Sequence, residues 1–306
     1  AISGTPSSVT SSAAYTITAS NTGGSDTATV TIVVNDVAPS SLSYSPNSFT
    51  LTKGTAMTTV SPTLSGGTVI SWSVSPSLPA GLSLDSSTGA ISGTPTAITS
   101  SASYTVTASN TGGSDTATVT IEVNDIAPSA LVFSPNSFTL TKGTAMTTVT
   151  PTASGGPITS WSVSPSLPAG LSLDSSTGAI SGTPSAVTSS ATYTITASNT
   201  GGSTTADVTI VVNDIAPASL TYSPNSFTLT KDSAMTTVTP SASGGAVTGW
   251  SVSPSLPAGL SLDSSTGAIS GTPTAVSSSA TYTVTASNTG GSTTATVSIT
   301  VNDIAP

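Results

Sequence analysis

The clearest alternation of apolar and polar residues lies between positions 104 and 123. Tyr104, Val106 and Ala108 fall on one side of an extended chain, and the Thr residues between them fall on the other side. After the segment 110–113 (Asn-Thr-Gly-Gly) the alternation resumes and continues to Val123. Alternation with a period of two on both sides of an Asn/Gly-rich segment predicts two half-buried strands joined by a tight turn.

Shorter apolar segments precede this hairpin and are separated by Gly or Pro. We predict strands at Phe49–Thr52, Met57–Val60, Ile70–Val74, Leu82–Leu84 and Ala90–Ser92. Together with the hairpin they make roughly seven short strands, which is the pattern of a β-sandwich of the Ig-like type. We therefore expect an all-β fold with Trp72 in the core rather than on the surface as a ligand platform.

The whole pattern repeats every 89 residues without insertion or deletion, as the positions of Trp72, Trp161 and Trp250 show. Each copy closes on Asn-Asp-(Val/Ile)-Ala-Pro, with the Pro at 39, 128, 217 and 306. This period is that of a small domain able to fold alone, and it is too long for a solenoid repeat. We therefore expect a partial repeat, which is the C-terminal part of an Ig-like domain in a longer protein, followed by three complete repeats. The predicted boundaries are 1–39 for the partial repeat and 40–128, 129–217 and 218–306 for the complete repeats.

Composition excludes several classes of function. The chain has no Cys, His or Arg and only three Lys, against 12 acidic residues, which gives a net charge of −9. Nucleic acid and anionic lipid both require clustered Lys and Arg, so neither is an expected partner. No apolar run is long enough for direct membrane insertion. We expect no enzyme, because the usual catalytic side chains are missing and the few carboxylates recur at the same places in the repeats.

Three segments of each complete repeat carry a family resemblance. In the first complete repeat they are 78–85 (Leu-Pro-Ala-Gly-Leu-Ser-Leu-Asp), 88–95 (Thr-Gly-Ala-Ile-Ser-Gly-Thr-Pro) and 104–110 (Tyr-Thr-Val-Thr-Ala-Ser-Asn). They resemble the putative-Ig (He_PIG-type) repeat of bacterial surface proteins, a family related to cadherin-like domains. The resemblance covers the partial repeat and all complete repeats. It implies tandem Ig-like or cadherin-like β-sandwich domains in secreted or cell-surface proteins, often large adhesins, without a catalytic site.

The resemblance to cadherin-like arrays also implies calcium at the joints between domains. The candidate ligands are Asp85, Asn124 and Asp125 at one joint and Asp174, Asn213 and Asp214 at the next. Ca²⁺ takes about six to eight oxygen ligands, several of them from carboxylates, and each joint offers only two carboxylates. The alternative is that Asp85 bonds the backbone of its own turn and that Asn124–Asp125 ends a strand. We expect no cofactor and no tight calcium site, and joints stiffened by Pro and by packing of Ile126–Ala127 on the next repeat.

Two kinds of covalent modification stay open. Lys53 on the opening strand and Asn124 on the closing strand have the positions of a Lys–Asn isopeptide cross-link, although Lys53 precedes a Gly and is expected to be solvated. The many Ser and Thr side chains would accept O-linked sugars.

We expect a structural stalk or fibre segment of an extracellular bacterial surface protein or adhesin, which spaces a terminal module from the cell. Its partners would be neighbouring repeats of the same long chain. Two alternatives stay open: a multivalent glycan-binding module, and a subunit of an extracellular filament in which identical chains associate. Sugar sites usually present exposed aromatic side chains, so the predicted core position of the Trp residues favours the stalk.

Overall fold

The protein was analysed as a computed structural model, which describes residues 1–304. The predicted end of the last repeat at Ala305–Pro306 lies outside the described residues. All regular secondary structure in residues 1–304 is β-strand, and no helix there is long and apolar enough to cross a membrane. The chain divides into two compact units, residues 1–127 with 155–157 and 199–202, and the other described residues. Each unit is described by itself.

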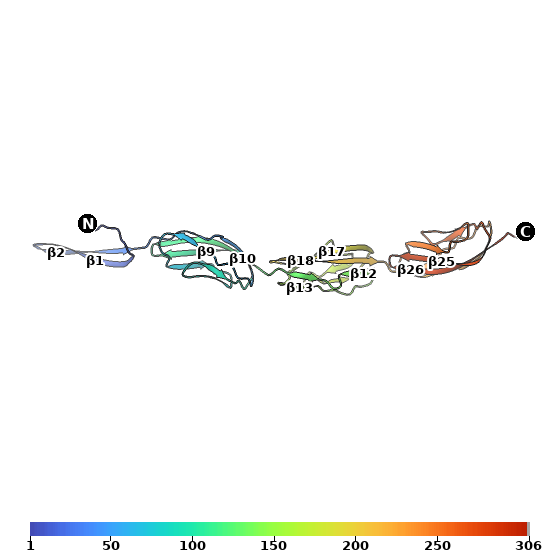
Figure 1. The fold of residues 1–306 in the computed structure, drawn as a ribbon, viewed down its shortest axis with the longest axis horizontal. Helices are drawn as coiled ribbons and strands as arrows, with labels where there is room; N and C mark the ends of the chain where they lie inside the picture. Colours follow the sequence, from blue (N-terminus) through green and yellow to red (C-terminus); the bar gives the residue numbers. More distant parts are fainter. Residues whose placement is uncertain (305–306) are drawn as a thin grey trace. The chain divides into compact units, whose positions relative to one another are not determined.

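The partial repeat forms one hairpin of β1 (Thr10–Asn21) and β2 (Gly24–Val34), which is a separate two-stranded sheet (Figure 1). In its register Tyr15 lies opposite Val30 and Asn21 lies opposite Gly24. Tyr15 is 47% exposed, whereas Tyr104 at the same position of the first complete repeat is 4% exposed. A complete repeat therefore buries a face that the hairpin alone leaves open.

The first complete repeat has eight strands in two layers. They are β3 (Ser40–Ser43), β4 (Ser48–Thr52), β5 (Thr63–Ser65), β6 (Ser71–Ser75), β7 (Leu82–Leu84), β8 (Ile91–Gly93), β9 (Thr99–Asn110) and β10 (Gly113–Asn124). One layer is a four-stranded sheet in the order β4-β10-β9-β6. The other layer consists of the pairs β3-β5 and β7-β8, and an isolated bridge joins Val60, which precedes β5, to Ile91 of β8. This is the predicted all-β sandwich.

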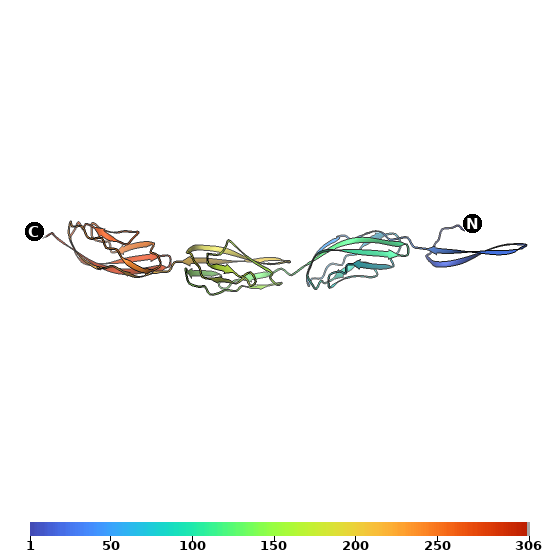
Figure 2. The same ribbon diagram turned by 180° about the vertical axis from the view of Figure 1, so that it is seen from behind.

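The other two complete repeats have the same order of strands, and Figure 2 shows them from the opposite side. In the second complete repeat the strands are β11 (Ser129–Val132), β12 (Ser137–Thr141), β13 (Thr152–Ser154), β14 (Ser160–Ser164), β15 (Leu171–Leu173), β16 (Ile180–Gly182), β17 (Thr188–Asn199) and β18 (Gly202–Asn213). In the third they are β19 (Pro217–Thr221), β20 (Ser226–Thr230), β21 (Ser241–Gly244), β22 (Gly249–Ser253), β23 (Leu260–Leu262), β24 (Ile269–Gly271), β25 (Ser277–Asn288) and β26 (Gly291–Asn302). The four-stranded sheets have the orders β12-β18-β17-β14 and β20-β26-β25-β22.

An early strand and the last strand of each complete repeat run parallel. β4 pairs with β10 from Ser48 opposite Thr120 to Thr52 opposite Asn124. Outside the strands' own ladder, Asn47 O accepts a hydrogen bond from Thr120 N at 2.8 Å, and Lys53 N donates one to Asn124 O at 2.8 Å. β12 with β18 and β20 with β26 have the same parallel register. An N-terminal strand and the C-terminal strand of each complete repeat are therefore hydrogen-bonded to each other at one edge of the four-stranded sheet.

The core consists of the residues that the alternating pattern placed inward. Val106, Ala108, Val119 and Ile121 are fully buried, and Ile91 reaches them from the smaller layer. The prediction for the hairpin is thus confirmed. Trp72 packs against this core but is only half-buried, and Trp161 and Trp250 do the same in their repeats.

Three details of the predicted strands were wrong. Ile70 is not an inward strand residue: it is 67% exposed, and β6 begins one residue later. Residues 57–60 are not a strand, because only Val60 makes a β-bridge, although Met57 N donates to Gly93 O at 2.9 Å. β3 and β5 were missed. β3 has four mostly Ser residues with a register shift between Ser40 and Ser43, and β5 has only three residues, so neither gives an alternating signal.

Candidate functional site

The segment that follows β2 lies on two turns of the first complete repeat. Asp36 N donates to Thr111 Oγ1 at 3.0 Å, and Val37 O accepts hydrogen bonds from Asn110 Nδ2 at 2.7 Å and from Gly67 N at 3.2 Å. Asn110 Nδ2 also donates to Thr68 O at 3.1 Å, so one amide joins the linker to both turns. We call the turns 66–67 and 110–113 together the linker cradle of this repeat.

Glycine lets the linker backbone approach both turns of the cradle. A Cβ atom at Gly112 would collide with the carbonyl oxygen of Asp36, and one at Gly67 would collide with that of Val37. A Cβ at Gly113 would be crowded rather than blocked, since it would lie 3.1 Å from the Cβ of Ala38. The absence of side chains at these positions creates the room in which the linker lies.

The other linkers repeat the contacts made by the Thr hydroxyl and the Asn amide. The bond from the Gly67 nitrogen does not recur in the same form: in the third repeat Gly245 N donates to Ala216 O at 3.5 Å. Asp125 N donates to Thr200 Oγ1 at 3.0 Å, and Asn199 Nδ2 donates to Ile126 O at 2.7 Å. The corresponding distances for Asp214 to Thr289 and for Asn288 to Ile215 are 2.9 and 2.7 Å. The second cradle consists of residues 155–156 and 199–202, and the third consists of 244–245 and 288–291. In every case the contacting residues belong to one compact unit.

The linkers are held mainly by their backbones. Ile126 O is bound, but the Ile126 side chain is 50% exposed, so the expected packing of Ile126–Ala127 is correct only for the backbone and for the half-buried Ala127. Pro128, which follows, is buried. The linker therefore contacts the repeat through its peptide groups, its Ala and its Pro, and leaves the intervening Val or Ile free.

Asp85 lies in the turn between β7 and β8 and bonds that turn. Its Oδ1 accepts hydrogen bonds from Ser87 Oγ at 2.6 Å, Ser87 N at 2.8 Å and Thr88 N at 2.8 Å. These bonds, that from the Ser87 hydroxyl above all, lower the pKa of Asp85 to about 2. The pKa of Asp174 and that of Asp263 are lowered by the same bonds in their turns.

The calcium candidates occupy three kinds of place. Asp85 and Asp174 lie in the β7–β8 and β15–β16 turns, where their Oδ1 atoms accept hydrogen bonds from Ser and Thr. Asn124 and Asn213 end β10 and β18, and their carbonyl oxygens accept hydrogen bonds from the backbone nitrogens of Lys53 and Lys142. Asp125 and Asp214 lie in the linkers, and the Oδ1 of each accepts a hydrogen bond from the next backbone nitrogen, at 3.0 and 2.9 Å.

No hydrogen bond joins these three places to a common point. Within residues 1–304 no group of three or more Asp, Glu, His or Cys side chains could hold a metal ion. The expectation of no tight calcium site at the joints stays a prediction. The candidate residues lie in a hydrogen-bonded turn, at a strand end and in a linker. Lys53 and Asn124 are adjacent through their backbones, and the isopeptide cross-link likewise stays a prediction.

Each indole lies under a glycine turn. A Cβ at Gly89, whose φ is +71°, would come within 2.5 Å of Trp72 Cε3. The carbonyl oxygen of Gly89 accepts a hydrogen bond of 2.6 Å from the hydroxyl of Tyr44. One face of the indole is thus covered by backbone, which leaves little of it open as a platform for a sugar ring.

Sequence reasoning predicted the Asn-Thr-Gly-Gly turn but missed its contact with the linker. The available signal was repetition: the turn recurs unchanged in all copies, and a second Gly-Gly pair recurs at 66–67, 155–156 and 244–245. A tight turn needs fewer glycines than these positions contain, so the additional glycines indicate a close contact with another segment.

The fold and these joints define the class of protein: a tandem array of Ig-like β-sandwich domains. The family described as putative Ig domain matches residues 38–124, 127–213 and 216–302, and the chain belongs to that family. Each matched stretch begins at or next to the Ala-Pro of a linker. No curated protein matches the chain.

Arrays of Ig domains are among the solved structures to which the chain is similar. An I-band fragment of titin is 16% identical, covers 88% of this chain and 99% of its own length, and has a TM-score of 0.39. The eight N-terminal Ig domains of Down syndrome cell adhesion molecule are 14% identical, with coverages of 96% and 40% and a TM-score of 0.41. Immunoglobulin domains 1–5 of Sidekick-1 are 18% identical, with coverages of 97% and 68% and a TM-score of 0.37. The family assignment rests on the sequence match.

Proposed function

We propose that this segment is a non-catalytic stalk or fibre segment of an extracellular bacterial surface protein or adhesin, which carries tension and spaces a terminal module from the cell. Its partners are the neighbouring repeats of the same chain. The observation that carries the proposal is the parallel pairing of β4 with β10, repeated in every complete repeat.

The parallel pair suits a chain that is pulled from its two ends. Tension that passes the linker and β3 reaches β4 at its N-terminal end, and it leaves the repeat at the C-terminal end of β10. Because the strands are parallel, these forces slide one strand along the other and load the hydrogen bonds from Asn47–Thr120 to Lys53–Asn124 together. An antiparallel pair pulled from the same end would instead open one bond at a time. Mechanical resistance of this kind is determined by the rate of unfolding under force.

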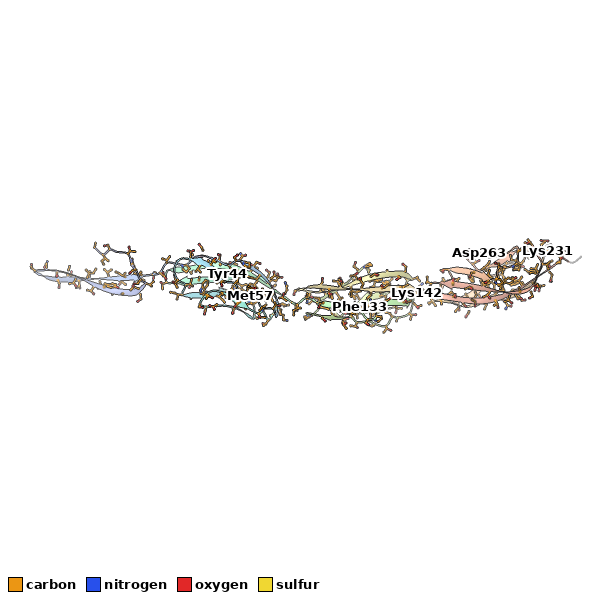
Figure 3. The ribbon with its side chains drawn as sticks, in the orientation of Figure 1. Tyr44, Met57, Phe133, Lys142, Lys231 and Asp263 are labelled. Atoms are coloured by element: carbon orange, nitrogen blue, oxygen red, sulfur yellow. The ribbon has the colours of Figure 1, made fainter. Side chains whose placement is uncertain are left out.

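The side-chain chemistry supports a role without catalysis. The residues that could act as acid or base are few, and the pKa of Asp85 is lowered by its own turn, as expected of a structural carboxylate. A surface groove of about 350 Å³ in the first complete repeat is lined by apolar side chains, among them Phe49, Leu51 and Met57. Met57 is labelled in Figure 3. Ser45, Thr58 and Thr59 also line the groove, but no acidic or basic side chain lies there to activate their hydroxyls.

Single-molecule pulling of the 306-residue chain tests the proposal. We expect one unfolding step for each complete repeat, and each step releases roughly 300 Å of chain, since about 89 residues extend by about 3.3–3.6 Å each. Lys53→Pro removes the backbone N–H that bonds Asn124 and should move one step to a lower force, with about fivefold faster unfolding at a fixed force. Lys53→Ala keeps this N–H and is the matched control.

Equal effects of the two Lys53 variants, or unfolding of the unmodified repeats at negligible force, would refute the tension-bearing role. The second and third complete repeats keep Lys142 and Lys231 and serve as internal standards in the same molecule (Figure 3). The extracellular assignment has a separate readout: an antibody against the repeats should label intact cells of the source bacterium. Labelling only after lysis would contradict that assignment and leave the mechanical result unaffected.

A further inference from the structure

The linker cradle occurs in all three complete repeats, at the turn that joins the two longest strands. We propose that it is a recognition site for an extended peptide of the form Asp-x-Ala-Pro, which latches the end of the preceding repeat onto the next repeat without a metal ion. This inference does not depend on the stalk function, because it concerns only how one repeat binds the linker before it.

The polar groups of the cradle form hydrogen bonds with backbone atoms of the peptide. In the first cradle, Thr111 Oγ1 accepts from Asp36 N, and Val37 O is bound by Asn110 and Gly67. Asn110 is itself held in place, because its Oδ1 accepts a hydrogen bond from Gly112 N at 2.8 Å. The donor amide is thus oriented by the same turn whose glycines make room for the linker.

The choice of residues in the peptide follows from their positions. Ala38 is half-buried, and a Cβ atom at Gly113 would lie 3.1 Å from the Cβ of Ala38, so two small residues face each other closely at this point. Pro39 is buried. Val37 is exposed, and this is the one linker position that changes between copies, Val in the first and Ile in the others. The cradle therefore selects Asp, Ala and Pro and is indifferent to the residue between Asp and Ala.

Asp36 contributes within the peptide and needs no cation. Its Oδ1 accepts a hydrogen bond of 2.8 Å from Val37 N and lies against Gly67, where a Cβ would be 2.7 Å away. The carboxylate thereby satisfies the next N–H of a chain that makes no regular ladder at this point. In a metal-bound joint the Asp36 carboxylate would be a calcium ligand. Here it accepts a hydrogen bond from the backbone nitrogen of the next residue instead.

The chain supplies its own control for a test. Gly23 and Thr22 occupy the turn of the partial repeat, 89 residues before Gly112 and Thr111. A Cβ at Gly23 would meet only Asn21 Oδ1, at 3.4 Å, whereas one at Gly112 would collide with the linker. We expect Gly112→Ala to raise the hydrogen-exchange rate of the Asp36 amide by about tenfold or more, and Gly23→Ala to leave it unchanged. Mass spectrometry with fragmentation to single amides measures the rates in the full chain, in chelator.

A second pair of variants keeps the test decisive if Gly112→Ala also weakens the domain. Thr111→Val deletes only the hydroxyl that accepts from Asp36 N and should raise exchange at that amide by about fivefold, while the core amides of Val119 and Ile121 stay protected. Thr22→Val is its control. Unchanged exchange at Asp36 in both Thr111→Val and Gly112→Ala would overturn the proposal. So would protection of the linker that appears only when calcium is added.

Discussion

At one buried position the second complete repeat lacks a hydroxyl that the other two repeats have. Tyr44 and Tyr222 donate hydrogen bonds of 2.6 Å to the carbonyl oxygens of Gly89 and Gly267. Position 133 is Phe in the second repeat (Figure 3). Burial raises the pKa of Tyr44 and that of Tyr222 to about 12. A buried Tyr and a buried Phe can thus be compared at equivalent positions of different repeats in one chain.

Tyr44→Phe should lower the free energy of unfolding of the first complete repeat by about 1–2 kcal/mol, because the buried carbonyl of Gly89 loses its donor. Phe133→Tyr should raise that of the second repeat by a smaller amount. Urea denaturation followed by Trp fluorescence measures both effects, since each complete repeat has one Trp, once the other two Trp residues are replaced by Phe. Loss of stability in both variants would show that the sites differ in more than the hydroxyl.

The inward residues of the hairpin could be predicted because alternation is a local property, and Ile70 shows where that rule ends. Counting by two from Trp72 places Ile70 inward. The half-buried residue before this strand is Val69, with Ile158 and Val247 in the other repeats, while the position of Ile70 holds Thr159 and Thr248. The alternation of inward and outward side chains therefore shifts by one residue where the strand begins. Only a comparison of the three repeats reveals this shift.

The β7–β8 turn illustrates how one carboxylate organises a connection between short strands. Each strand of the pair has three residues, so the ladder is short. Asp85 N donates to Ala90 O at 2.8 Å, and Gly89 N donates to Asp85 O at 2.9 Å, which closes the turn around the side-chain bonds. The ionised carboxylate is the form that accepts these bonds.

Acid should weaken these turns over a defined range of pH. The folded pKa of Asp85, about 2, lies below the unfolded value of about 3.9, so the carboxylate stabilises the fold above about pH 4. This contribution is lost as the pH falls from about 4 to about 2. The carboxyl ¹³C shift of Asp85 should therefore titrate with a midpoint near 2, and Asp85→Asn should remove that part of the acid dependence of urea denaturation. A midpoint near 4 would mean that the hydrogen bonds do not form in solution.

Elements differed in how far the sequence revealed them. β9 and β10 have 12 residues each and alternate from Tyr104 to the turn and from the turn to Val123, so their pairing and turn were predictable. β3 has four residues, and Ser41 has a φ of +57°, which breaks the strand's periodicity. Residues 57–60 are apolar enough for a strand, but their partner, β8, has only three residues and reaches only Val60 for a bridge.

At the scale of the whole molecule the joints should not require calcium. The melting temperature of the chain should change by less than about 1 °C between a buffer with millimolar calcium and one with chelator, because an ion that does not bind cannot stabilise the folded state. Differential scanning calorimetry measures this. A large fall in chelator, abolished by Asp125→Asn, would instead make Asp85, Asn124 and Asp125 a calcium site.

The repeat length and the Ig-like class were open to prediction, whereas the linker cradle was not. The contacts of Val37 with Asn110 and of Asp36 with Thr111 join residues 73 and 75 positions apart. A glycine in a sequence indicates that the backbone is unrestricted at that position. It does not indicate which distant segment will pack against it. That pairing emerges only when the sandwich brings its loops to one end.

The cradle bears on how such a gene can change. Linker and turns are the same in every copy apart from Val or Ile at one exposed position, so unequal crossing-over that keeps the 89-residue register leaves every new junction with a complete latch. Copies can then be gained or lost without any compensating substitution. A mutation of one cradle glycine would weaken one junction only, and recombination with a sister copy could erase it. Length would in this way be a trait free to vary among lineages while the joint stays constant.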